Sequence, residues 1–323
     1  MPSKLNTFGE KFRQQKLPAW QPNYTSNKTI FALLLIGVGF ISIGVIVLVT
    51  TNSVQEYTKI YTHCNLDNDR PNSQSIDCAH YTSDFQGLEC KCRVSLNIPK
   101  KMKSPIYIYY GLTNFYQNHR MYVKSKDSNQ LLGKVWKPED LSADCGDYRV
   151  HNGKAVSPCG IIPNTIFNDT FIIKYEGKNV IINEEGISWE TDRMYKFNNP
   201  TNYNISQMTK PTNWHKDITE FDNHLGYKSE KLIVWMRLSA YPNFRKAYGR
   251  IEKDLEAGIY NISINYNYPV DVFNGEKSII LSTTSYLGGK NRFIGIMYVL
   301  SGVSGIDYRS MDRNVNAIWG LEE

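Results

Sequence analysis

The longest stretch without a charged residue covers residues 29–55. Its central part, residues 30–49, contains only apolar side chains, glycine and one serine. Because 20 helical residues rise about 30 Å, the thickness of a bilayer's hydrocarbon core, this pattern predicts a transmembrane helix over residues 29–50. The run is too long for the apolar part of a signal peptide, and no small-residue cleavage site follows it. We therefore expect the helix to remain in the mature protein.

The charges on either side of this helix predict its orientation. Five basic residues and one acid precede it, whereas acids and bases are mixed after it. By the positive-inside rule, residues 1–28 form a cytosolic N-terminus, and the chain after residue 51 lies in the lumen or outside the cell.

Between residues 51 and 292 the apolar runs are short and rich in β-branched and aromatic residues, which is typical of strands. These runs cover residues 106–110, 171–173, 180–182, 232–236 and 278–282. Residues 260–266 alternate apolar with small polar side chains, as in a strand with one face in a core. Helical periodicity is found only in residues 115–123 and 244–255. The region is therefore expected to be mainly β, an antiparallel β-sandwich with minor helices.

The cysteines and the glycosylation sequons independently support a luminal location for this region. All six cysteines follow the membrane helix: Cys64, Cys78, Cys90, Cys92, Cys145 and Cys159. An even number in an oxidising compartment favours three disulfides, and zinc is disfavoured because Cys90 and Cys92 are too close for the usual chelate. N-glycosylation is expected at Asn168, Asn204 and Asn261, but not at the cytosolic sequons of Asn23 and Asn27.

Composition and motifs argue against catalysis. The chain has 323 residues, of which 41% are apolar and 21% charged, with a net charge of +6 and no basic stripe for nucleic acid. No phosphate-binding loop, paired-histidine metal motif or nucleophile elbow is present. The acid pairs Glu184 with Glu185 and Glu190 with Asp192 are interpreted as solvated surface acids. We predict no catalytic centre, metal, cofactor or small-molecule substrate.

A set of unusual strings carries a family resemblance. Residues 109–127, YYGLTNFYQNHRMYVKSKD, closely resemble a hallmark segment of the cell division control protein 50 / ligand-effect modulator family. Further strings match in order: LPAW (17–20), PCG (158–160), FNDT (167–170), GISW (186–189), VWMR (234–237), NFRK (243–246), YNYPV (266–270) and LGGKN (287–291).

The resemblance implies a non-catalytic accessory β-subunit of a type IV P-type ATPase that flips phospholipids. Such a subunit forms a heterodimer with the ATPase α-subunit in contact with membrane lipids, and supports folding, endoplasmic reticulum exit and lipid translocation. The family has a cytosolic N-terminus, two membrane spans and a glycosylated, disulfide-bonded luminal domain. The implied location is the endoplasmic reticulum, Golgi, secretory vesicles or plasma membrane.

The resemblance also narrows the fifteen ways of pairing six cysteines. It implies nested bridges from Cys64 to Cys92 and from Cys78 to Cys90, and a third bridge from Cys145 to Cys159. In this scheme Cys90 and Cys92 point to the same side of one strand.

Two groups of residues are candidates for contact with the ATPase. Gly37 and Gly44 lie seven residues apart on one face of the membrane helix, where another helix could approach closely. In the 109–127 string, the side chains expected to face outward are those of Asn118, His119, Arg120 and Lys124.

The C-terminal end departs from the family pattern. The apolar run at residues 293–306 has 14 residues, about 21 Å of helix, against the roughly 30 Å of a bilayer core. The tail at residues 307–323 begins with Asp307 and carries no resemblance. Residues 293–306 are therefore expected to be a truncated second span that fails to cross, leaving the tail on the luminal side or against the membrane surface. The alternative is that local bilayer thinning lets this short span cross.

Three other functions stay open at this point. One is a single-span lectin-like or receptor glycoprotein, and another is a luminal hydrolase that uses Glu190 and Asp192. The third is a truncated, non-functional isoform of the flippase subunit.

Overall fold

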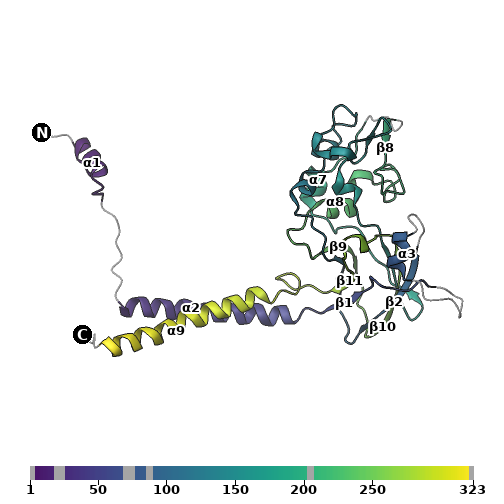
Figure 1. Ribbon diagram of the computed structural model, residues 1–323. Coiled ribbons are helices and arrows are strands. Elements are labelled where there is room, and N and C mark those ends of the chain that lie inside the picture. The colour runs from purple at the N-terminus through teal and green to yellow at the C-terminus, as the bar shows by residue number, and fades with distance from the viewer. Residues whose placement is uncertain (1–3, 18–25, 68–76, 85–89, 202–206, 320–323) are drawn as a thin grey trace. The chain divides into compact units, whose positions relative to one another are not determined.

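The computed structural model describes residues 4–17, 26–67, 77–84, 90–201 and 207–319. The chain forms two compact units (Figure 1). The helical unit comprises residues 1–52 and 291–323, and the β-rich unit comprises residues 53–290. Trp20 of the LPAW string and the sequon residue Asn204 lie outside the described residues.

The helical unit contains α1 (Lys4–Arg13), α2 (Ser26–Asn52) and α9 (Phe293–Trp319). In the part of the chain that the structure describes, α2 is the one helix long and apolar enough to cross a membrane. This confirms the helix expected over residues 29–50. The apolar part of α9 covers only Phe293–Asp307, but the helix continues to Trp319 without a break. The expected short span and residues 307–319 of the tail therefore form one continuous helix.

The β-rich unit is built on two four-stranded sheets in which every neighbouring pair is antiparallel. The first sheet has the order β1 (Glu56–Ile60), β11 (Lys277–Ser282), β3 (Ile106–Leu112), β9 (Phe244–Ile251). The second has the order β2 (Cys90–Ile98), β10 (Gly258–Tyr266), β6 (Thr170–Tyr175), β7 (Lys178–Asn179).

Alternate side chains of both sheets enter one hydrophobic core. The first sheet contributes Ile106, Ile108, Ile279 and Leu281, and the second contributes Ile98, Ile173, Ile262 and Ile264, all of them buried. One inward and one outward face per strand is the pattern of a sandwich. The expected antiparallel β-sandwich with minor helices is confirmed.

Short elements complete the unit. They are α3 (Cys78–Asp84), α4 (Arg120–Lys124), α5 (Ser128–Leu131), α6 (Ile161–Asn164), α7 (Glu190–Tyr195), α8 (Glu230–Met236) and the small sheet of β4 (Val150–His151), β5 (Lys154–Val156) and β8 (Met208–Thr209). Among the described residues, 3₁₀ helices cover Ala143–Tyr148, Gly226–Lys228 and Asp271–Phe273.

Several local predictions were wrong. Residues 244–255 do not form a helix, because Phe244–Ile251 pairs with β3 as strand β9. Residues 232–236 are not a strand but part of α8, whose first turn is capped by the Ser229 hydroxyl, which accepts from the Leu232 amide. In residues 115–123 only the end is helical, as α4. Residues 180–182 lie beyond the end of β7.

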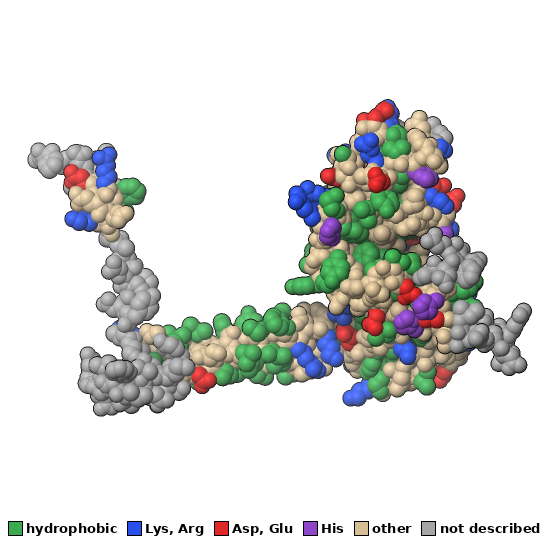
Figure 2. Space-filling model, in the orientation of Figure 1, with side chains coloured by type: hydrophobic (Ala, Val, Ile, Leu, Met, Phe, Trp, Pro, Cys, Tyr) green, Lys and Arg blue, Asp and Glu red, His purple; other side chains and the backbone are tan. Residues whose placement is uncertain are grey.

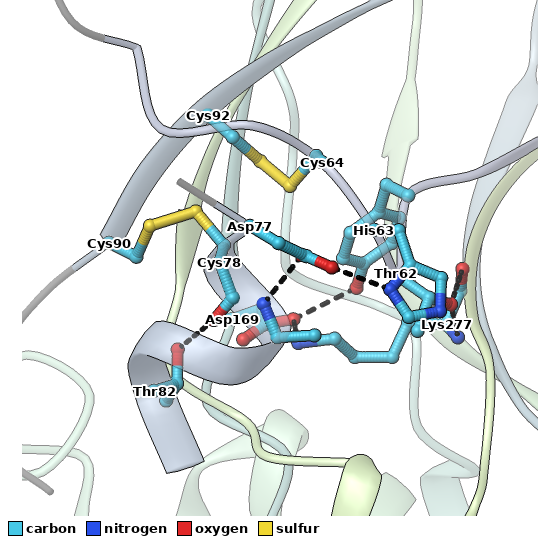
Figure 3. The surroundings of a disulfide bond; sticks show 12 residues. Thr62, His63, Cys64, Asp77, Cys78, Thr82, Cys90, Cys92, Asp169 and Lys277 are labelled. Atoms are coloured by element: carbon cyan, nitrogen blue, oxygen red, sulfur yellow. Dashed lines mark hydrogen bonds and ion pairs between the residues drawn. A yellow bond between two sulfur atoms is a disulfide. The ribbon is translucent and has the colours of Figure 1, made fainter. Parts of the chain in front are cut away.

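Three disulfides link the same cysteines as in the implied scheme. Cys64 is bonded to Cys92, Cys78 to Cys90 and Cys145 to Cys159. Cys90 and Cys92 are both buried on the same side of β2. The sulfurs of Cys64, Cys78 and Cys92 lie within 4.8 Å of one another, but each belongs to a disulfide, so the group is two neighbouring bridges (Figure 3).

A fully buried ion pair lies close to these bridges (Figure 3). Lys277 Nζ is 2.7 Å from Asp169 Oδ2, and both side chains are 0% exposed. The Lys277 ammonium also donates to the Tyr268 carbonyl, over 2.6 Å, and lies above the Tyr266 ring. Burial lowers the pKa of Lys277 to about 8, although the Asp169 carboxylate opposes this shift.

The remaining acceptor positions of Asp169 are also filled. Its Oδ1 accepts from the backbone amides of Asn267 and Tyr268, both at 2.7 Å. Its Oδ2 accepts from the Tyr61 hydroxyl at 3.0 Å, and burial together with the Asp169 charge raises the pKa of that hydroxyl. A buried carboxylate is tolerated when it is paired and hydrogen-bonded in this way. Asp169 thereby joins segments next to β1, β6, β10 and β11, which belong to both sheets.

We expect Lys277→Met to destabilise the protein strongly, because it leaves Asp169 buried without its counter-charge. Removing one partner of a buried pair costs about 3–5 kcal/mol, which lowers Tm by roughly 6 °C or more for a unit of this size. Thermal unfolding of the full chain in detergent measures the shift. Lys174→Met, on the exposed face of β6, is the matched control and should change Tm little. Equal Tm values for the two variants would contradict the assigned role of the pair.

Candidate partner-binding surface

Residues 113–124 form a turn followed by α4, and a second loop, residues 237–243, holds the turn in place. The Phe115 amide donates to the Pro242 carbonyl at 3.0 Å, and Asn118 Nδ2 donates to the Ala240 carbonyl at 2.9 Å. Gln117 is fully buried between the loops, where its Oε1 accepts from the Ser239 amide at 2.9 Å. These three hydrogen bonds therefore hold both loops in a defined shape.

The aromatic residues of this segment anchor it in the core. The Phe115 ring packs against the rings of Tyr122 and Trp235, with centroids 5.7 and 5.8 Å away. The Tyr122 hydroxyl lies 2.8 Å from Thr165 Oγ1, and burial raises the pKa of that hydroxyl to about 12. These contacts leave the remaining side chains of the segment free to face outward.

Seven of the exposed side chains of these loops define what we call the loop surface: Tyr116, Asn118, His119, Arg120, Met121, Lys124 and Tyr241. The structure places all four polar candidates, Asn118, His119, Arg120 and Lys124, among the exposed residues. Sequence reasoning missed the apolar members. Tyr116 is 57%, Met121 67% and Tyr241 75% exposed. Apolar groups held out on a rigid backbone are typical of protein interaction sites.

Three of the sequence strings meet beside the loop surface. The Arg237 guanidinium of VWMR lies 3.5 Å from the ring centroid of Trp189, the last residue of GISW, which is 62% exposed. A cavity of about 280 Å³ is lined by both residues and by Lys246 of NFRK. Arg237 follows α8 directly, so the loop that ends at 243 connects this stacked pair to the loop surface.

Lys246 is buried and caps the C-terminal end of α8. Its Nζ donates to the carbonyls of Val234, Trp235 and Arg237. Carbonyls at a helix C-terminus lack intrahelical partners, and a cation there also interacts favourably with the helix dipole. Burial, and secondly the charge of Arg237, lower the pKa of Lys246 to about 7.

Two of the four acids considered for hydrolysis are engaged in ion pairs, and Asp192 is buried rather than solvated as expected. Asp192 lies 2.6 Å from Lys196, and Glu184 lies 2.6 Å from Lys231. Glu185 and Glu190 are exposed. Two carboxylates at a glycosidic bond would have to face each other across a substrate site, whereas Asp192 and Glu184 face lysines.

Gly37 and Gly44 face the chain's own helix α9. A Cβ built on Gly37 would lie 2.8 Å from the Gly302 carbonyl oxygen, and one on Gly44 would lie 2.7 Å from Val299 Cγ2. The two helices run side by side, with apolar side chains along their visible face (Figures 1 and 2). Gly295 packs in turn against Leu48. The close approach expected at these glycines is thus made within the chain.

The two described sequons differ in their surroundings. Asn261 is exposed on β10, whose buried positions alternate with it. Asn168 is half-buried beside Asp169 and lines a second cavity.

Comparison with known proteins gives the same family as the resemblance carried by these strings. Residues 47–306 match the profile of the LEM3 (ligand-effect modulator 3) family / CDC50 family. The chain belongs to this family. It is 38% identical over 315 residues to mouse cell cycle control protein 50A, covering 90% of this chain and 84% of the mouse protein.

Relatives with other names show the same extent of similarity. ALA-interacting subunit 3 of Arabidopsis thaliana is 39% identical over 297 residues, covering 90% of this chain and 81% of the plant protein. Human cell cycle control protein 50B is 34% identical over 316 residues, covering 90% and 88%. In this chain, the loop surface is formed by residues of the 109–127 string and of the segment between VWMR and NFRK.

We expect a bulky side chain at Gly44 to separate α2 from α9, because no space for a Cβ exists there. Phe40 and Tyr298, whose ring centroids are 5.4 Å apart, are replaced by cysteines and joined with a short bismaleimide. The described cysteines are all in disulfides, so labelling is specific. Gly44→Leu should lower the cross-linking yield severalfold. Gly39→Leu is the control, since a Cβ there meets nothing within 4 Å. Equal yields in both variants would contradict the assigned contact.

The lowered pKa of Lys246 predicts a pH-dependent stability. The unfolded chain keeps this proton up to about pH 10.5, whereas the folded chain loses it near pH 7. Unfolding therefore binds a proton in this window, and the free energy of unfolding rises with pH by up to about 1.4 kcal/mol per unit. Lys246→Met should flatten the rise in the free energy of unfolding between pH 7 and 9. The rise that remains is due to Lys277, whose pKa is also lowered, to about 8. Denaturant unfolding at several pH values tests this, with exposed Lys253→Met as control. An unchanged slope in Lys246→Met would contradict it.

Proposed function

We propose that this chain is the non-catalytic accessory subunit of a type IV P-type ATPase that flips phospholipids. Family membership and the loop surface support the proposal. Apolar and charged side chains on two mutually braced loops can bind a partner without first becoming ordered, which lowers the entropic cost of association. Family membership is the observation that carries the proposed function, and the loop surface is the feature that carries the assigned binding site.

Binding to the ATPase is sufficient to account for the role of an accessory subunit. A subunit that binds only the folded, transport-competent ATPase shifts the population toward that form by mass action. We infer that it supports folding of the α-subunit, exit from the endoplasmic reticulum and the transport cycle in this way. The complex works in the Golgi, secretory vesicles or plasma membrane.

The proposed orientation places the N-terminus in the cytosol and the β-rich unit in the lumen, with glycans at Asn168, Asn204 and Asn261. It also makes α9 a second crossing, in place of the expected failure of residues 293–306 to span the bilayer. Gly302 contacts Gly37, and Gly305 lies 3.9 Å from Gly37 when a Cβ is added, so the apolar part of α9 runs beside most of α2. A bilayer that accommodates α2 therefore surrounds α9 as well. Modest local thinning covers the remaining mismatch.

We expect the loop surface to decide capture of the ATPase. The triple variant Tyr116→Ser, Met121→Ser, Tyr241→Ser should lower co-purification of type IV P-type ATPases by about tenfold or more, since exposed aromatic anchors carry much of the binding energy. Mass spectrometry of the detergent-purified complex measures this.

The matched control removes three equally exposed apolar groups elsewhere on the β-rich unit, at Ile181, Ile259 and Val272. Both triple variants should keep the wild-type Tm. Absence of any such ATPase from the wild-type preparation would refute the proposed function, and equal capture by both variants would refute the assigned surface.

The second crossing predicts the location of the C-terminus. A glycosylation acceptor appended after residue 323 on a flexible spacer should stay unmodified in microsomes, because α9 delivers it to the cytosol. Asn261 in the same molecule reports on translocation of the β-rich unit. Modification of the appended acceptor would show that α9 does not cross and that the chain is single-pass.

A further inference from the structure

The three residues of the Asn168 sequon line a cavity of about 360 Å³ in the β-rich unit. This volume lies in the range of small-molecule sites. Aromatic residues form much of its wall, among them Tyr110, Trp214, Phe221 and Tyr248. The partner-binding role proposed above does not use this cavity.

The aromatic wall offers ring faces rather than unpaired polar groups. Trp214 and Phe221 have ring centroids 4.4 Å apart, and the Trp214 indole nitrogen already donates to the Pro163 carbonyl at 2.7 Å. The Tyr248 hydroxyl already accepts from the Phe171 amide at 3.2 Å. A small-molecule site also needs a few polar groups. Asp222 and Lys231 supply them here, with Lys231 Nζ 3.4 Å from Asp222 Oδ1.

Asn168 is held at this cavity by its neighbours. Asp169 is locked in the core by its four donors, and Thr170 begins β6. The Asn168 carbonyl accepts from Asn267 Nδ2 at 3.3 Å, which fixes its backbone further. The side-chain Oδ1 of Asn168 is buried and has no hydrogen-bond partner. A buried acceptor without a partner is costly and points to a donor that fills the site.

We propose that the first N-acetylglucosamine of an N-linked glycan on Asn168 occupies this cavity. The C–H face of the sugar ring packs on Trp214 and Phe221, and its hydroxyl and acetamido groups reach Asp222, Lys231 and the Asn168 Oδ1. The glycan is thus a structural part of the β-rich unit. The inference rests on the luminal location given under the proposed function.

The covalent step precedes folding, so burial of the folded site is no obstacle. The transfer forms a bond between Asn168 Nδ2 and C1 of the sugar, while the bond from C1 to the lipid pyrophosphate carrier breaks and Nδ2 loses one proton. Folding then closes the cavity around the attached sugar. Asn261 provides the contrast, because it stands on an outward face of β10 and lines none of the described cavities.

The test compares glycan release at the two sites in one native preparation of the full chain. Peptide N-glycosidase treatment in ¹⁸O water, followed by peptide mass spectrometry, gives a rate for each asparagine. Release at Asn168 should be about tenfold or more slower than at Asn261, because the enzyme needs the sugar to leave the cavity first. The two rates should become equal after denaturation.

Three variants make the assignment specific. Ala247→Phe fills the cavity from β9 and should bring release at Asn168 close to the rate at Asn261. Thr170→Ala prevents attachment while keeping the Asn168 side chain, and should lower Tm more than Asn261→Gln does. His215→Ala, on the exposed rim, is a milder variant that should also speed release if Ala247→Phe fails to fold.

An unglycosylated Asn168, or equal native rates at Asn168 and Asn261, would overturn the proposal. So would a cavity-filling or rim variant that leaves the Asn168 rate unchanged. These outcomes are independent of ATPase capture, which is measured on the same preparation. If the release rates contradict the cavity assignment while ATPase capture is normal, only this inference fails. If capture is lost while release at Asn168 stays slow, only the proposed function fails.

Discussion

The carboxylate of Asp169 is the interaction on which the β-rich unit depends. It is fully buried, and it is tolerated there because Lys277, Tyr61 and the amides of residues 267 and 268 supply a counter-charge and four hydrogen bonds. These donors come from segments beside strands of both sheets. The pair therefore fixes how one sheet lies on the other, and with it the backbone of the Asn168 sequon.

Buried, hydrogen-bonded polar groups also hold the loop surface in place. Gln117 and Lys246 are buried polar groups whose partners are backbone amides or carbonyls of a second segment. The Gln117 hydrogen bond ties two loops that are remote in the chain, whereas Lys246 ties β9 to the end of the preceding helix α8. The side chains left outside are free to contact a partner. The chain can therefore act through a preformed surface, with paired glycines bringing α2 and α9 together.

The sequence allowed prediction of the membrane helix from its long uncharged apolar run, and of strands such as Tyr260–Tyr266 from their alternation of apolar and polar residues. Strand β9 was missed, since its polar residues hide the alternation and its pairing with β3 joins segments far apart. The short apolar run in α8 fits a strand or a buried helix equally well, and only the Ser229 cap distinguishes them. At the site, the exposed polar residues of one string could be predicted. Tyr241 could not, because its place beside that string depends on tertiary hydrogen bonds.

The central claim is that the loop surface binds the ATPase. Hydrogen exchange, measured peptide by peptide in the purified complex and in the free chain, tests it most directly. The account predicts slower exchange in residues 113–124 and 237–243 on complex formation, with no change in β10. Unchanged exchange in both loops, or protection confined to β10, would contradict it.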